Sequence, residues 1–155
     1  MATATKPDRR SVTNRLKFSV DLAAPRDTVW RVLWDDASFR DWSSVFAEGS
    51  YAVSDWNEGS TVQFIDPTSR GGMSSVIEKK RPGEFMSFRH EAEIKDGKVQ
   101  PPAEWSGAHE NYTLTTNDGR TTVTVDLDAP DEYRQMFESK FPQALQRVKT
   151  LAETA

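Results

Sequence analysis

His90 and Glu110 are the two side chains whose types and positions best suit acid–base chemistry. Each lies in a run of alternating apolar and polar residues, where His90 shares a side with Phe88 and Glu110 shares a side with Tyr112. If both sides face inward, an imidazole and a carboxylate enter an apolar space. Such a pair could transfer protons or orient the polar end of a ligand. The alternative is a structural pair at a cavity rim, so both are candidates and no catalytic residue is assigned.

A set of large side chains forms a second candidate site. Aromatic and apolar residues line sites for lipophilic ligands, although ordinary core packing explains most such residues. Trp30 and Trp34, on an early helix, are assigned to the core. Trp56 and Trp105 lie beside turns, which favours the mouth of a cavity. The residues expected to line a ligand cavity are Trp42, Trp56, Phe64, Met73, Met86, Phe88, His90, Trp105, Glu110, Tyr112, Phe137, Phe141 and Leu145.

Other kinds of site lack their motifs. The chain has no cysteine, which excludes disulfides, zinc–thiolate sites and thiol catalysis. It has two histidines, expected on opposite faces of a sheet, so no metal site is predicted. Gly71 and Gly72 lack the spacing of a phosphate-binding loop, and we expect no cofactor. The formal net charge of −4 argues against nucleic acid as a partner.

The N-terminal residues point to a cytoplasmic protein. Residues 1–12 are polar, lack the apolar core of a secretory signal and are expected to form a flexible leader. No apolar run approaches the roughly 18 residues of a membrane span, so no membrane insertion is expected. The remaining residues, 13–155, are predicted to form a single domain.

The elements that must position these side chains change in type along the chain. Alternation predicts a first strand over 16–22, and helical spacing predicts two short helices after Pro25 and over 37–42. Period-two patterns and turn signals then predict strands over 51–56, 62–64, 73–80, 86–94, 104–115 and 121–127. The last segment, 128–155, reads as a long amphipathic helix with Asp128 as N-cap and Pro130 in its first turn, and Pro142 predicts a kink or break near Phe141. This order predicts an α+β fold in which an antiparallel sheet carries helices on one face.

Several motifs in this order resemble one family. They are Leu22-Ala23-Ala24-Pro25 with Val29-Trp30 and Leu33-Trp34, Asp55-Trp56 leading to Gly59-Ser60, Glu110 to Leu114 followed by 121–125, and Pro142 to Leu145 with the tail to Glu153. Together they resemble the branch of the START/birch-allergen-like (SRPBCC) superfamily named for its likeness to the activator of the heat-shock-protein-90 ATPase; polyketide cyclases belong to the same superfamily. The resemblance implies a helix-grip fold, in which about seven antiparallel strands wrap around the C-terminal helix and enclose a hydrophobic cavity. It carries over no catalytic residue.

Three functions are compatible with these observations. The leading hypothesis is binding of a small lipophilic or aromatic molecule in the cavity between the sheet and the C-terminal helix. The second is an enzyme of the cyclase, dehydratase or hydrolase kind that uses His90 and Glu110. The third, which the resemblance suggests, is a co-chaperone-like interaction module, although the polar outer face of the last helix disfavours it. A homodimer paired through an edge strand is compatible with the sequence.

Overall fold

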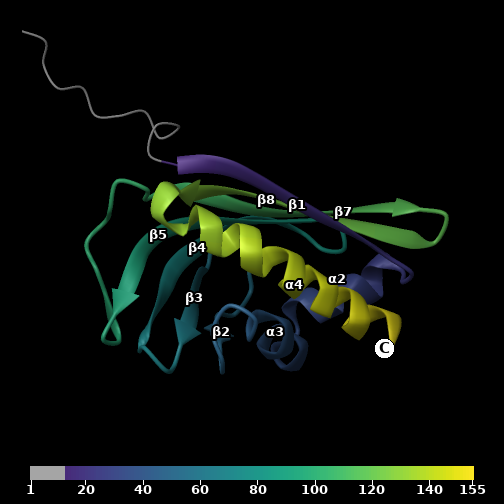
Figure 1. Cartoon of the computed structure of the whole chain (residues 1–155), viewed down its shortest axis with the longest axis horizontal. Helices are drawn as coiled ribbons and strands as arrows, with labels where there is room; N and C mark the ends of the chain where they lie inside the picture. The colour runs from purple at the N-terminus through teal and green to yellow at the C-terminus, as the bar shows by residue number, and fades with distance from the viewer. Residues whose placement is uncertain (1–12) are drawn as a thin grey trace, which may run out of the picture.

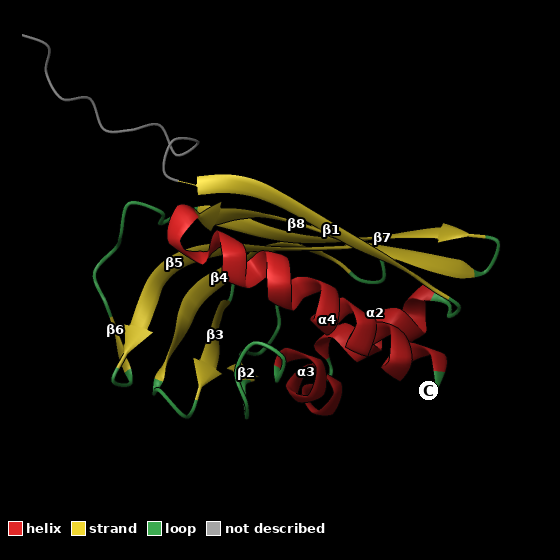
Figure 2. Cartoon of the chain, viewed as in Figure 1, coloured by secondary structure: helices red, strands yellow, loops and turns green. Residues whose placement is uncertain are grey.

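The computed structural model describes residues 13–155, and the leader expected over residues 1–12 lies outside the described residues. Two short helices follow the first strand, a run of strands comes next and a long helix ends the chain (Figures 1 and 2). The elements are β1 (Thr13–Leu22), α2 (Arg26–Trp34), α3 (Asp36–Ser43), β2 (Tyr51–Val53), β3 (Thr61–Asp66), β4 (Gly71–Arg81), β5 (Phe85–Lys95), β6 (Lys98–Val99), β7 (Ala108–Asn117), β8 (Arg120–Pro130), the 3₁₀ turn η1 (Asp131–Tyr133) and α4 (Arg134–Glu153).

The strands form one antiparallel sheet with the order β1-β8-β7-β5-β4-β3-β2, and β6 pairs with β5. Strands β2 to β5 pair in the order of the sequence and β7 pairs with β8, whereas the first strand pairs with the last, Leu16 opposite Leu127. The sheet is strongly twisted and the three helices lie on one side of it (Figure 2). This arrangement confirms the predicted α+β fold and helix-grip architecture.

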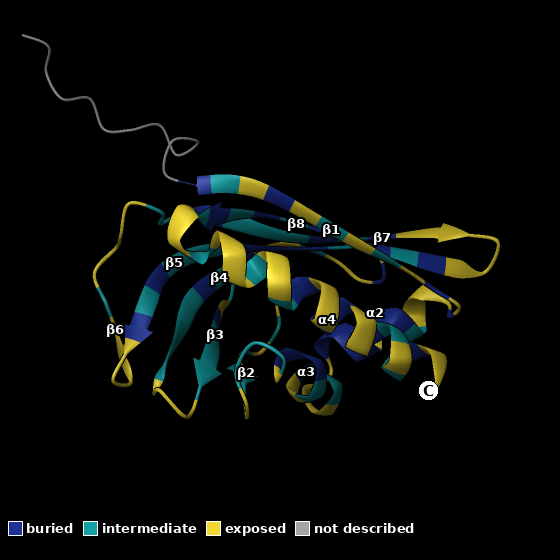
Figure 3. Cartoon of the chain, in the orientation of Figure 1, coloured by how far each residue is buried: buried dark blue, intermediate teal, exposed yellow. Residues whose placement is uncertain are grey.

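Helix α4 differs in burial between its two halves. Its C-terminal half buries Ala144, Leu145, Val148 and Ala152 in the core, whereas in its N-terminal half only Phe141 is buried. Pro142 lies at the boundary, and the helix continues through it without the predicted break. Exposed residues follow the outer face of α4 along its length (Figure 3). The C-terminal half is therefore the part of α4 that is fixed by packing.

The predicted start of the last helix is wrong. Asp128 does not cap it, because β8 continues to Pro130 and pairs Asp128 with Arg15 of β1. The Asp128 carboxylate accepts the backbone N–H of His109 at 2.9 Å and forms an ion pair with Arg15 at 3.0 Å. A long-range strand partner therefore prevails over the local capping signal.

Two predicted strands are shorter than their sequence patterns. Strand β2 ends at Val53, and the chain turns at Trp56, which has a positive φ of 63°. Strand β7 begins at Ala108, because the preceding residues form turns in which Ser106 N–H bonds Ala103 O and Ala108 N–H bonds Trp105 O.

Strand β5 contains a bulge that changes which side chains face inward. Ser75 pairs with His90 and Ser74 pairs with Ala92, so Glu91 has no partner across the β4 ladder. The alternation of the sequence predicts Ala92 and Ile94 on the same side as His90. The bulge reverses the alternation, and Glu93, rather than Ala92 or Ile94, lies on the side of the cavity described below.

Candidate functional site

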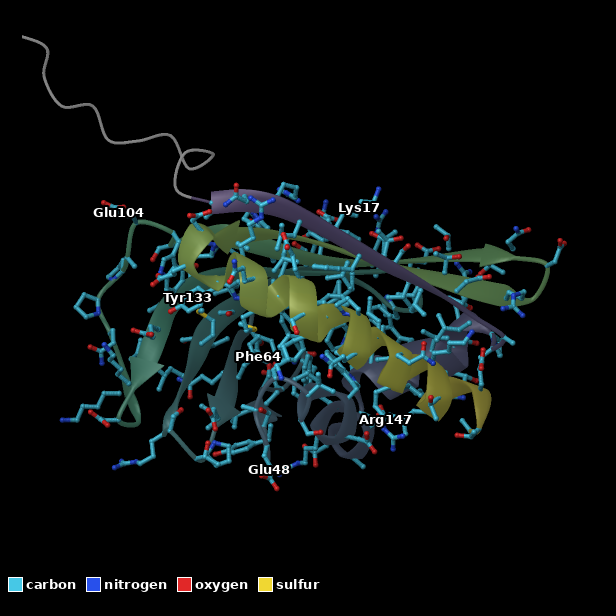
Figure 4. All side chains as sticks on the ribbon, in the orientation of Figure 1. Lys17, Glu48, Phe64, Glu104, Tyr133 and Arg147 are labelled. Carbon is cyan, nitrogen blue, oxygen red and sulfur yellow. The ribbon has the colours of Figure 1, made fainter. Side chains whose placement is uncertain are left out.

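A cavity of about 340 Å³ lies between the curved sheet and the helices. Strands β2, β3, β4, β5, β7 and β8 contribute residues to its sheet side. Helices α2 and α3, the segment 46–50, η1 and the N-terminal half of α4 complete the lining. Figure 4 labels Phe64 on β3 and Tyr133 in η1, both of which line this space. The volume falls in the range of sites for small organic molecules.

Aromatic rings dominate the lining. Trp34 packs edge-on against Tyr112 and Phe88, with ring centroids 4.9 and 5.3 Å apart, and Phe64 packs edge-on against Phe88 at 5.2 Å. These rings are held by their neighbours in the geometry that aromatic pairs prefer. The aromatic residues that line the cavity are Trp34, Phe39, Trp42, Phe46, Tyr51, Phe64, Phe88, Trp105, Tyr112, Tyr133, Phe137 and Phe141.

A chain of hydrogen bonds crosses three strands on the sheet side of the cavity. The Ser75 hydroxyl lies 2.6 Å from His90 Nδ1, and His90 Nε2 lies 3.0 Å from Glu110 Oε1. The Tyr112 hydroxyl donates to Glu110 Oε2 at 2.5 Å. The side chains of His90 and Glu110 are 13% and 18% exposed, so the pair predicted from sequence alternation is formed and largely buried.

The geometry of this chain limits what His90 can do. Both imidazole nitrogens already have protein partners, Ser75 on one side and Glu110 on the other. A neutral ring that carries its proton on Nε2 donates to Glu110 and accepts from Ser75, which satisfies every member. The carboxylate of Glu110 has about four lone-pair positions and uses two of them, so Glu110 is the charged member of the chain that lines the cavity and can still accept a hydrogen bond.

Tyr112 is held as a neutral donor. Burial, and then the charge and hydrogen bond of Glu110, raise the pKa of the Tyr112 phenol well above its usual value. The hydroxyl therefore stays protonated across the physiological range and keeps donating to Glu110. Sequence patterns placed Tyr112 beside Glu110 but carried no signal for this bond or for the contribution of Ser75 from a neighbouring strand.

The structure gathers most of the predicted cavity residues around this space. Three lie elsewhere: Met86 and Leu145 are buried in the surrounding core, and Trp56 packs against Trp34 from outside the lining. The predicted residues that do line the cavity are Trp42, Phe64, Met73, Phe88, His90, Trp105, Glu110, Tyr112, Phe137 and Phe141.

Two lining residues carry polar atoms that the sequence did not single out. Trp34 Nε1 and Ser43 Oγ are closed to solvent, and neither has a hydrogen-bond partner among the described residues. Both residues are more than nine-tenths buried and both line the cavity. Buried polar groups without partners are uncommon in folded proteins. Trp34, which was assigned to the core, is thus both a core residue and part of the cavity wall.

His109 lies on the opposite face of the sheet from His90. Its Nε2 hydrogen bonds Glu78, and its Nδ1 lies 4.0 Å from Asp128. Within residues 13–155 no group of three or more histidine, aspartate or glutamate side chains is arranged to hold a metal ion. In the same part of the chain, no helix is long and apolar enough to cross a membrane.

A curved antiparallel sheet that encloses a cavity against a C-terminal helix defines a helix-grip protein. Residues 23–153 match the family described as "Activator of Hsp90 ATPase homolog 1-like protein". The match covers most of the sequence, and the chain belongs to this family. No curated protein matches the sequence at a significant level.

Solved structures share the fold at low sequence identity. The Aha1 dimer from Colwellia psychrerythraea has a TM-score of 0.71 and 17% identity over 90% of this chain and 96% of that one. CV1439 from Chromobacterium violaceum has a TM-score of 0.66 and 18% identity over 90% and 97%. DynU16, from the dynemicin biosynthetic locus, has a TM-score of 0.66 and 17% identity over 96% of this chain, which spans 48% of DynU16.

Proposed function

We propose that this protein binds a small lipophilic, predominantly aromatic molecule in the cavity between the sheet and helices α2, α3 and α4. The observation that carries the proposal is the cavity itself, about 340 Å³ in volume and lined mainly by aromatic rings. A flat ligand placed among such rings gains both apolar burial and stacking contacts. Glu110 supplies a polar group that orients a ligand.

The alternatives receive less support. For His90 to act as a general base, it would have to release either Ser75 or Glu110, because both of its nitrogens are engaged. A co-chaperone-like interaction through α4 would use its outer face. That face carries polar residues such as Arg134 and Glu138, which pair with each other at 2.8 Å. Aha1 from Colwellia psychrerythraea is described as a dimer. By this likeness, a homodimer of this chain is a further proposal.

Native mass spectrometry of freshly purified protein, compared with the denatured mass, tests for a retained ligand. Binding of an environment-sensitive dye such as 1-anilinonaphthalene-8-sulfonate measures an accessible apolar cavity if the purified protein is empty. A retained organic mass or saturable dye uptake supports the proposal. A bare mass together with no dye uptake would refute it.

A cavity-filling variant locates the site. Ala47 lines the cavity from the segment after α3, so Ala47→Phe should reduce ligand or dye affinity about tenfold or more while the fold is kept. Ala37, on the exposed side of α3, offers the matched control Ala37→Phe, which should bind like the wild type. Equal affinity in both variants would place the ligand elsewhere.

A further inference from the structure

We propose that the cavity selects ligands whose polar end donates a hydrogen bond and carries no negative charge, that is, lipophilic alcohols, phenols or amines, and that it rejects carboxylates. Glu110 is the residue that makes this selection. The inference rests on the proposed function, since it names the class of ligand that the cavity binds.

The charge of the lining supports this selection. Among the described residues, those that line the cavity include four with carboxyl groups and no lysine or arginine, and His90 is the single basic residue. The carboxylate of one of the four, Asp128, lies on the opposite face of the sheet beside Arg15 and His109. The carboxyl residues are Asp66, Glu93, Glu110 and Asp128. An anionic ligand would have to lose its hydration next to these groups without gaining an opposite charge, which is unfavourable in an apolar cavity.

Three of the four carboxyl groups have local roles that explain them. Asp66 accepts hydrogen bonds from Thr68 and Ser69, and these lower its pKa. Asp128 pairs with Arg15 on the neighbouring strand. Glu93 lies 3.9 Å from Lys95 and has a side chain that is 41% exposed, at the rim.

Glu110 is largely buried and, unlike Asp128 and Glu93, has no lysine or arginine partner among the described residues; it also accepts fewer hydrogen bonds than Asp66. Its contacts are His90 and the Tyr112 hydroxyl, which leave lone pairs of its carboxylate free. The hydrogen bonds that run from Ser75 through His90 fix the position of the Glu110 carboxylate. A ligand that donates a hydrogen bond there completes the site, and a ligand cation also meets the faces of the surrounding rings.

Four probes that share one carbon skeleton test the selection: 2-naphthylmethylamine, 2-naphthylmethanol, 2-methylnaphthalene and 2-naphthoate. At neutral pH they present a cation, a neutral donor, no polar group and an anion. Calorimetric titration of the wild-type protein should give affinities for the amine and the alcohol about tenfold or more above that for the carboxylate. Tighter or equal binding of the carboxylate would overturn the proposal.

The variant Glu110→Gln assigns the selection to its residue. It removes the charge with little change in volume, and we expect the ratio of amine to carboxylate affinity to fall about tenfold. Glu138→Gln, on the outer face of α4, is the matched control and should keep the wild-type ratio. An unchanged ratio in Glu110→Gln would overturn the role of Glu110. Should that variant fail to fold, the wild-type series still decides the selection.

The two proposals fail in different ways. If the probes bind without discrimination by charge, the selection is refuted and the binding function stands. If none of the four probes binds and no dye enters the cavity, the binding function is refuted, and the selection falls with it.

Discussion

At the scale of single residues, the sequence predicted the meeting of His90 and Glu110 but not its consequence. Alternation along two strands placed each side chain on the inner face, and pairing of neighbouring strands brought them to 3.0 Å. Ser75 comes from a third strand, whose register is set by a bulge, and no local pattern indicates it. Its bond engages the second nitrogen of His90, whereas the Glu110 carboxylate keeps unused lone pairs.

Tyr112 provides a prediction at this scale. Replacing Tyr112 by Phe removes a buried hydroxyl that donates to a carboxylate, so the free energy of unfolding should fall by about 1.5–3 kcal/mol. Urea denaturation at neutral pH measures the loss. Tyr51→Phe is the control, because Tyr51 is only half-buried and contacts Arg40 through its ring; its effect should stay within about 0.5 kcal/mol.

The pH dependence of the same residue has a definite sign. The pKa of Tyr112 is raised in the folded protein, first by burial and then by Glu110, above the value of about 10 that tyrosine has in an unfolded chain. The unfolded state therefore loses the phenolic proton first, and this contribution to stability is complete below about pH 10 and declines above it. Alkaline denaturation should be steeper for the wild type than for Tyr112→Phe. Parallel curves would contradict this account.

At the scale of elements, strands and helices were predicted best where a periodic pattern extends over many residues and the partner element is close in the sequence. The short helices after β1 and the hairpin strands follow local patterns. The start of α4 was misplaced because Asp128 and Pro130 carry capping signals, while pairing with β1 keeps this segment in β8. Glu93 was missed as a cavity residue because a bulge is a property of two strands together.

An ion pair between Asp41 of α3 and Arg147 of α4 gives a prediction for these two elements. The guanidinium contacts both carboxylate oxygens, at 2.5 and 2.9 Å, and its side-chain hydrogen bond lowers the pKa of Asp41. Because the pair lies at the surface and is screened by solvent, Asp41→Asn should cost about 0.5–1 kcal/mol of unfolding free energy.

The sign of the pH effect follows from the lowered pKa. Asp41 stabilises the fold above its unfolded pKa of about 3.9, and this contribution is lost as the pH falls through the lower folded pKa. The difference between the wild type and Asp41→Asn should be constant from pH 5 to 8 and shrink below about pH 4. Added salt should reduce it at every pH. A difference that grows in acid would exclude the ion pair as its cause.

At the scale of the whole molecule, packing is uneven around the cavity. The C-terminal half of α4 is embedded in the core, whereas the N-terminal half and η1 cover the cavity with partly exposed side chains. Pro142 separates the two halves and lacks the N–H that would bond the carbonyl of Glu138. Local stability should therefore be lower in the N-terminal half of α4, which is the half that a ligand would contact.

Native-state amide hydrogen exchange measures this difference. In the free protein, amides of residues 136–141 should exchange about tenfold or more faster than those of residues 145–152, because fewer buried contacts oppose their opening. A bound ligand such as 2-naphthylmethanol stabilises the states in which its site is formed, so exchange in residues 136–141 should slow by more than in residues 145–152. The tip of the β7–β8 hairpin, residues 117–120, lies outside the cavity lining and serves as the internal control, with rates that do not change.

Equal slowing in all three segments would mean that the probe stabilises the whole fold without contacting α4. Slowing confined to residues 136–141 would show that the N-terminal half of α4 is ordered by the molecule it covers.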